Sequence, residues 1–151
     1  NRLPGIMTLG YIAAFSETLA LAVVVSKGIP PLKDAIISEP EDHLKAAAAW
    51  SLGQIGRHSP DHARALAEAD VLRRMLAVYL HQDSSEDLQI KAKRGLKSVI
   101  QKCTHLPALE PLLQESPPNI LKYVVQQFAK VLPHDLQARR SFVESGGLQK
   151  I

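Results

Sequence analysis

The sequence predicts an all-α fold, built as an α-solenoid in which short helices of repeated units stack along one axis. Three observations support this prediction. Helix-forming residues are abundant, with 18 alanines and 21 leucines among 151 residues, whereas aromatic residues make up only 5%, which argues against an all-β sandwich or barrel. Apolar residues recur at the spacing of an amphipathic helix. The apolar pattern itself also returns after about 43 residues, a period typical of helical repeat arrays.

The repeat is clearest in the segments expected to form the longest helices. The segment Leu9-Gly10-Tyr11-Ile12 returns as Leu52-Gly53-Gln54-Ile55, 43 residues later. Four apolar positions recur in three successive helices: Leu44, Ala48, Leu52 and Ile55; then Leu88, Ala92, Leu96 and Val99; then Ile120, Val124, Phe128 and Val131. The last interval is 32 residues instead of 44, so the third unit is expected to be abbreviated.

We expect a single solenoid domain over residues 1–151. It divides into a partial unit at 1–15, units at about 16–58, 59–103 and 104–132, and a partial unit at 133–151. Each full unit should contain a short first helix, a second helix and a longer third helix. First helices are expected at 17–27, 61–69 and 135–145, second helices at 30–37, 71–81 and 107–114, and third helices at 41–57, 86–102 and 119–132. The abbreviated unit should lack its first helix, because only three residues separate Cys103 from Pro107.

Residues that start and stop helices agree with these boundaries. Ser59 is expected to cap the helix that begins at Pro60, since serine favours the N-cap and proline the first helical position. Ser84 and Asp87 have the spacing of a capping box at the start of a third helix. Gly28 is expected to end the helix before it, because glycine adopts the left-handed conformation found at helix C-termini.

Charge and composition limit the kinds of partner. The net charge is +3 and the pI about 9.1, and the whole excess lies in residues 76–151, where five cations fall at Lys91, Lys93, Arg94, Lys97 and Lys102. This stripe is weaker than the footprint of a dedicated nucleic-acid binder, so no nucleic-acid partner is expected. No apolar run reaches the length of a membrane span, and the first residues do not resemble a signal peptide. A single cysteine excludes an internal disulfide framework, which indicates a cytoplasmic protein.

The sequence offers no support for catalysis. His58 and His62 are four residues apart, but Ser59-Pro60 lies between them, so they do not share a helix face and no metal site is expected. Cys103 and His105 lack a third group that could orient the histidine, and a partly buried structural thiol is the preferred interpretation. There is no phosphate-binding loop, dinucleotide fingerprint or metalloprotease motif. We therefore expect no enzyme activity, no cofactor and no metal.

The candidate binding residues lie on the outward face of the third helices, opposite the apolar positions, where a solenoid usually binds its partners. They are Met7 and Tyr11 in the partial first unit; His43, Ala47, Trp50, Gln54 and Arg57 in helix 41–57; Lys91, Arg94, Ser98 and Gln101 in helix 86–102; and Tyr123, Gln126 and Lys130 in helix 119–132. Trp50, the only tryptophan, is either a binding anchor or a packing residue between third helices. Lys91 and Arg94 are either partner contacts or a solvated charged face. Small residues at 46–49 are expected to let neighbouring helices approach closely.

The segment Ala48–Ile55, with the letters AAWSLGQI, resembles the third-helix signature of armadillo repeats. The resemblance implies a right-handed armadillo superhelix and a noncatalytic binding scaffold. Importin-α adaptors in this class grip basic peptides with paired Trp and Asn. Here Gln54 stands at the Asn position, and Arg94 with Ser98, Gln126 with Lys130 and Met7 with Tyr11 replace the other pairs. A basic face is unsuited to basic signals, so a soluble transport adaptor that binds peptide signals is the alternative function and not the preferred one.

Residues 39–65, 84–89, 102–113 and 117–148 together resemble the sperm-associated antigen 6 family. The resemblance implies a microtubule-associated scaffold in the central apparatus of the ciliary and flagellar axoneme, required for motility. The implied location is the cytoskeleton of the axoneme, and the implied partners are tubulin or other central-apparatus proteins. The chain would correspond to the later repeats of a longer protein.

Two further expectations concern the surface. Leu9, Ile12, Leu148 and Ile151 belong to helices at the two ends of the array, so we expect apolar surface and self-association there. The cations Arg57, Lys91, Arg94 and Lys130 share one side with no acid at the corresponding positions. Acidic protein partners are therefore expected, with the acidic tails of tubulin as one candidate.

Overall fold

The computed structural model describes residues 3–134 and residue 140, and this part of the chain contains helices and no strands. The helices are α1 (Leu3–Phe15), α2 (Glu17–Val25), α3 (Ile29–Ser38), α4 (Asp42–Gly56), α5 (Pro60–Glu68), α6 (Val71–Leu80), α7 (Glu86–Lys102), α8 (Leu106–Glu115) and α9 (Pro118–Val131), followed by the 3₁₀ turn η1 (Leu132–His134). The prediction of an all-α fold is confirmed. None of the helices in this described part is long and apolar enough to span a membrane.

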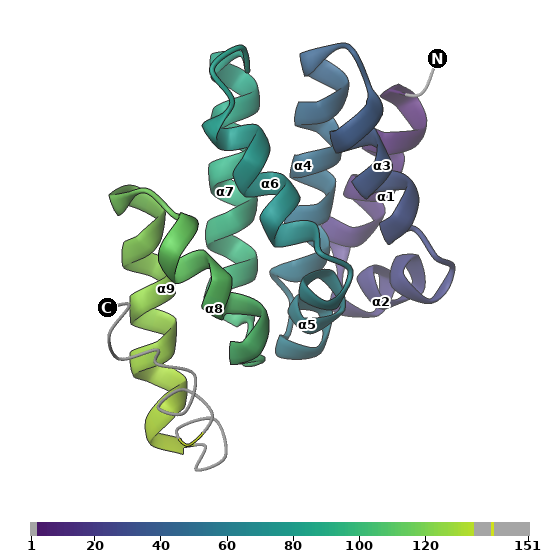
Figure 1. The fold of residues 1–151 in the computed structure, drawn as a ribbon. Helices are drawn as coiled ribbons and strands as arrows, with labels where there is room; N and C mark the ends of the chain where they lie inside the picture. Colours follow the sequence, from purple (N-terminus) through teal and green to yellow (C-terminus); the bar gives the residue numbers. More distant parts are fainter. Residues whose placement is uncertain (1–2, 135–139, 141–151) are drawn as a thin grey trace.

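The helices form two layers that run in the order of the chain. The long helices α1, α4, α7 and α9 make one row, in which each contacts the next, and α3, α6 and α8 lie in front of that row in Figure 1. Each helix expected within residues 3–134 is present with its ends within two residues of the predicted ones, and α7 has the predicted ends. Thr104 and His105 are the only residues between Cys103 and α8, so no helix precedes α8 in its unit. The helix predicted at 135–145 lies outside the described residues.

The predicted N-cap of α5 is confirmed, whereas the predicted capping box of Ser84 and Asp87 at α7 is not formed. The hydroxyl oxygen of Ser59 accepts a hydrogen bond from the backbone N–H of His62. At α7 it is Ser85 that caps the helix and accepts from the N–H of Leu88. The Ser84 hydroxyl instead donates to the carbonyl oxygen of Val78 at 2.7 Å, which ties the end of α6 to the loop before α7.

Helix α2 ends before Gly28, as predicted, but Gly28 does not adopt the left-handed conformation that is common after a helix. That conformation belongs to Lys27, with φ 65°, whereas Gly28 has φ −75°. The N–H of Lys27 donates to Val24 and the N–H of Gly28 donates to Val23, which is the double hydrogen bond of a Schellman motif. A Cβ atom on Gly28 would lie 2.6 Å from Cγ1 of Val23, so the glycine is required by this close approach and not by its own φ.

The core lies between the two layers, and the long helices meet each other through small residues. A Cβ atom on Gly53 of α4 would lie 2.9 Å from the Cα atom of Gly95 in α7, so these two backbones are nearly in contact. All four alanines at 46–49 are buried, as the prediction of close helix approach requires. Ala47 was expected to face outward, but it is covered because it lies one turn before Ser51, whose hydroxyl donates to the Ile6 carbonyl of α1.

Candidate functional site

The structure places the predicted binding residues along the row of long helices, with different exposure. Tyr11, His43, Arg57, Arg94, Gln101, Gln126 and Lys130 are exposed, whereas Met7, Trp50, Gln54, Lys91, Ser98 and Tyr123 are half-buried. None of these thirteen residues is buried in the core. Their surroundings nevertheless separate them into residues that hold neighbouring helices together and residues that face solvent.

Trp50 packs between α1 and α4. Its ring covers Gly10, where a Cβ atom would overlap the indole, and it meets the ring of Tyr11 edge to face, with ring centroids 5.1 Å apart. Glycine at position 10 therefore makes room for the tryptophan. Trp50 is half-buried, so part of the indole is accessible beside Tyr11. The contacts of this side chain that the structure shows are packing contacts with α1.

Arg57 is engaged in holding α1. Its guanidinium donates a hydrogen bond from Nη2 to the carbonyl oxygen of Ala14 at 2.8 Å, and the Nε2 atom of His58 interacts with the carbonyl oxygen of Ala13. These carbonyls are in the last turn of α1, where no helical N–H is available to them. Arg57 thus acts as a cap for the neighbouring unit, a role that the sequence pattern did not indicate.

The cations of α7 differ from one another in their contacts. Lys91 lies 4.0 Å from Asp87, one turn earlier on the same helix, so a carboxylate does accompany this residue. Arg94 is exposed and has no ion pair within the described residues. The exposed face of α7 is centred on Arg94, Lys97 and Gln101, because Gly95 faces α4 and turns Lys91 and Ser98 toward that helix.

Lys97 is a candidate residue that the sequence analysis missed. Its ammonium nitrogen lies 5.5 Å from the centroid of the Tyr123 ring on α9, and the ammonium of Lys122 lies 5.0 Å from the same centroid. Both distances are typical of cation–π contacts. The spacing of three residues from Arg94 to Lys97 places both on one face of the helix. The sequence does not show, however, which side of α7 faces α9.

Three arginines of α5 and α6 are paired with carboxylates. Arg64 is 2.7 Å from Glu68, Arg73 is 3.0 Å from Glu115, and Arg74 is 3.5 Å from Asp70. The hydrogen bond from Arg64 is the main cause of a lowered pKa at Glu68. Asp70 and Glu115 also line a shallow groove of about 400 Å³ beside Arg73, Arg74 and Leu80.

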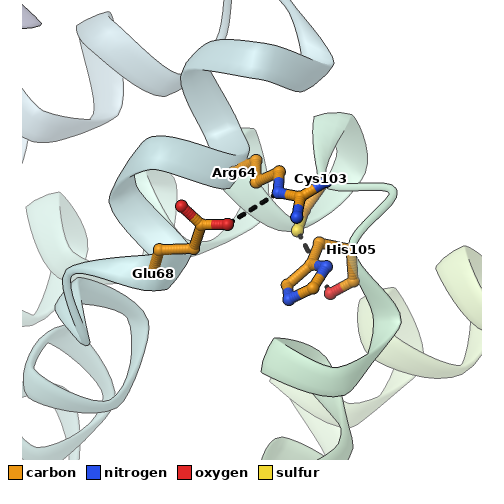
Figure 2. A network of polar contacts seen from close by, with 4 residues as sticks. All are labelled: Arg64, Glu68, Cys103 and His105. Atoms are coloured by element: carbon orange, nitrogen blue, oxygen red, sulfur yellow. Dashed lines mark hydrogen bonds and ion pairs between the residues drawn. The ribbon is translucent and has the colours of Figure 1, made fainter.

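Figure 2 shows the surroundings of Cys103 and His105. The cysteine side chain is fully buried, not partly buried as expected, and its Sγ atom lies 3.7 Å from the carbonyl oxygen of His105. That contact is with the backbone of His105 and not with its imidazole, so the pair does not form a nucleophile with its base. Burial raises the pKa of the Cys103 thiol, which disfavours the reactive thiolate.

The histidine pair is closer in space than the intervening proline suggested. The rings of His58 and His62 have centroids 6.2 Å apart. His62 is buried, and its Nδ1 atom hydrogen-bonds with the Ser59 hydroxyl. Within residues 3–134 and 140, no three histidine, cysteine, aspartate or glutamate side chains gather in a way that could hold a metal ion.

One end of the row exposes apolar side chains. Leu9 is half-buried and Ile12 is 37% exposed, whereas Leu52 and Ile55, the matching residues one repeat later, are completely buried. Phe15 at the end of α1 is 83% exposed. The expected apolar surface is therefore present at the α1 end, while Leu148 and Ile151 lie outside the described residues.

Comparison with solved structures identifies the class of protein. A designed armadillo repeat protein aligns with 98% of this chain and 65% of its own, with a TM-score of 0.64 and 16% identity. A second designed armadillo repeat protein, in complex with the peptide (KR)4, aligns with 96% of this chain and 64% of its own, with a TM-score of 0.59 and 19% identity. The fold is that of an armadillo-repeat solenoid.

Sequence comparison narrows the class to a family, although no protein-family model matches the chain. Sperm-associated antigen 6 of Homo sapiens and of Mus musculus are each 63% identical to it over 122 residues, which is 81% of this chain and 24% of theirs. Importin subunit alpha-8 of Arabidopsis thaliana is 25% identical over 135 residues, covering 85% of this chain and 30% of its own. The chain belongs to the sperm-associated antigen 6 family and spans about a quarter of the length of these relatives.

Proposed function

We propose that the protein is a noncatalytic scaffold that binds other proteins through its solenoid, as a microtubule-associated component of the axonemal central apparatus needed for motility. The 63% identity to two proteins named sperm-associated antigen 6 is the observation that carries this proposal. The name of those relatives connects them with sperm. The family resemblance is the basis for two further parts of the proposal. These are the place in the axoneme and the choice of tubulin or other central-apparatus proteins as partners.

The chemistry of the described residues is consistent with a scaffold. The potential nucleophile Cys103 is buried, with a raised pKa and no imidazole beside its sulfur. The surface along the long helices instead offers exposed polar and charged side chains on a rigid support. Such a surface can bind a protein partner through contact area and charge, as solenoid proteins usually do.

A peptide-binding transport adaptor is the second candidate, and one observation favours it: the 25% identity to an importin α subunit. The charges argue against it. A designed armadillo repeat protein in complex with the basic peptide (KR)4 shares the fold. On this chain, however, the exposed face of α7 and α9 carries Arg94, Lys97 and Lys122, which would repel such a peptide.

The two candidates predict different locations. The full-length protein, fused to a fluorescent tag and expressed in cells with motile cilia, should lie along the centre of the axoneme, inside the ring of outer doublets. Its depletion should reduce beating, and re-expression of the tagged protein should restore it. Staining of the nuclear rim with no signal in the axoneme would contradict the scaffold proposal and support the adaptor.

A further inference from the structure

We infer that the face formed by α7 and α9 binds an extended acidic segment of a protein partner, centred on Lys97, Tyr123 and Lys122. This inference rests on the proposed scaffold function and gives the chemistry of the partner. We call this surface the lysine–tyrosine face and define it by Arg94, Lys97, Gln101, Lys122, Tyr123 and Gln126.

Positive charge is in excess on α7 and α9. From Ile90 to Lys102 in α7, and throughout α9, the chain has seven lysines and arginines and no aspartate or glutamate. Among these seven, Lys91 alone has a carboxylate partner in the described part of the protein. On the surfaces of α5 and α6, by contrast, Arg64, Arg73 and Arg74 each have one. The facing helices α7 and α9 therefore carry more cations than their carboxylates compensate, unlike α5 and α6.

The two central lysines converge on one aromatic ring. Lys97 comes from α7 and Lys122 from α9, yet both ammonium groups approach the ring of Tyr123, at 5.5 and 5.0 Å from its centroid. Two cations near one ring concentrate positive charge at that place. Each ammonium group can form a charge-assisted hydrogen bond with a carboxylate of an acidic segment that lies beside the ring.

The side chains around these lysines suit a peptide better than a nucleic acid. Tyr123 is half-buried and already has two ammonium groups near its ring, so the ring is not a free platform for a nucleic-acid base. Gln101 and Gln126 are exposed on the same face and supply amide donors and acceptors suited to a peptide backbone. Exposed Ile90 gives one apolar contact at the start of the carboxylate-free part of α7. These features favour an extended peptide over single-stranded nucleic acid.

The test is the binding of a fluorescent decamer of glutamate to the full chain, measured by polarisation at low and at physiological salt. We expect binding that weakens about fivefold or more with the added salt, because the contacts are ionic. The double variant Lys97→Gln with Lys122→Gln should bind about tenfold more weakly. The matched control is Arg64→Gln with Arg74→Gln, which removes the same number of charges from paired sites and should bind like the unchanged protein. Lys97→Arg with Lys122→Arg should also retain binding, and helical circular dichroism should be equal in all proteins.

Equal weakening by the Lys97/Lys122 pair and by the control pair would overturn the inference, since binding would then depend on net charge alone. Stronger binding of a single-stranded DNA decamer, or of vesicles containing phosphatidylserine, than of the glutamate decamer would overturn it too. The result of this binding experiment can be distinguished from the result of the localisation experiment. Loss of glutamate binding with axonemal location retained would remove only this inference, whereas a nuclear location with glutamate binding retained would remove only the axonemal proposal.

Discussion

The contact between α4 and α7 differs from the contact between α7 and α9, although both join neighbouring long helices. In the first, Gly53 and Gly95 bring two backbones almost into contact. In the second, the residue that follows Gly95 by the same 32-residue interval is Gln127, a buried side chain whose amide donates to the Cys103 carbonyl at 2.6 Å. Contact between α7 and α9 is less extensive, and α9 extends beyond the end of α7 in Figure 1.

The difference explains where the lysine–tyrosine face arises. The α4–α7 pair, which meets through glycines, has the more extensive contact. The α7–α9 pair, called the wider pair below, has less contact, and the exposed side chains of Lys97 on α7 and Lys122 on α9 both approach the ring of Tyr123. We therefore expect the close pair to contribute mainly to stability, and we propose that the wider pair binds a partner.

The largest expected effect comes from breaking the close pair. Gly53→Leu places a side chain where a single Cβ atom would already lie 2.9 Å from the Gly95 backbone. We expect the free energy of unfolding to fall by about 3 kcal/mol, because overpacking here must separate two helices. Urea unfolding followed by circular dichroism measures it. The matched control is Gly5→Leu, at an α1 position with nothing within 4 Å of an added Cβ atom, which should not destabilise the protein. Similar losses in the two variants would show that the close contact has no special role.

Trp50→Ala tests the other close pair, α1 with α4. Loss of the indole leaves Gly10 uncovered and removes the ring contact with Tyr11, so we expect destabilisation of about 2 kcal/mol, less than for a fully buried tryptophan. The sequence interpretation of Trp50 as a binding anchor predicts instead an effect on partner binding of about 2 kcal/mol with little effect on folding. Measuring both quantities on the same variant separates the two interpretations. An unchanged urea midpoint would contradict the packing role.

The sequence was sufficient for the helices and insufficient for the contacts between units. Apolar spacing places α7 at Glu86–Lys102, because this signal acts within one helix. The roles of Arg57 and Lys97 depend instead on where the adjacent unit lies. Arg57 reaches the end of α1, and Lys97 reaches a ring on α9, over 43 and 26 positions of the sequence. Periodicity gives the buried side of each helix, but not which flank meets which neighbour.

The wider pair can be tested through its buried amide. Gln127→Leu keeps a similar volume but removes the donor to the Cys103 carbonyl at the end of α7. We expect a loss of about 1.5 kcal/mol, within the range for leaving a buried polar group without its partner. Gln127→Glu serves as a second variant, because its charged form would be buried without a hydrogen to donate. This variant should destabilise the protein more at neutral pH than at acid pH. If Gln127→Leu instead stabilised the protein, the hydrogen bond would not be what holds α9.

The smallest effect is expected far from both pairs, at the end of α2. Lys27 has φ 65°, a conformation that costs a residue with a side chain more than it costs glycine. Lys27→Gly should raise the free energy of unfolding by about 0.5 kcal/mol. This is the gain from relieving the left-handed conformation, reduced by the greater freedom of glycine in the unfolded chain. The neighbouring change Gly28→Ala should destabilise, because its Cβ atom would meet Val23. Thermal unfolding of the two variants should therefore shift in opposite directions, and a shift in the same direction would contradict the assignment of the left-handed residue.

Amide hydrogen exchange of the full chain, with and without a saturating glutamate decamer, tests most directly the claim that the wider helix pair is the binding surface. The account predicts added protection in α7 and α9, around Lys97 and Lys122, with exchange in α1 and α4 unchanged. Protection centred on α1 and α4, or spread evenly over all the helices, would contradict it.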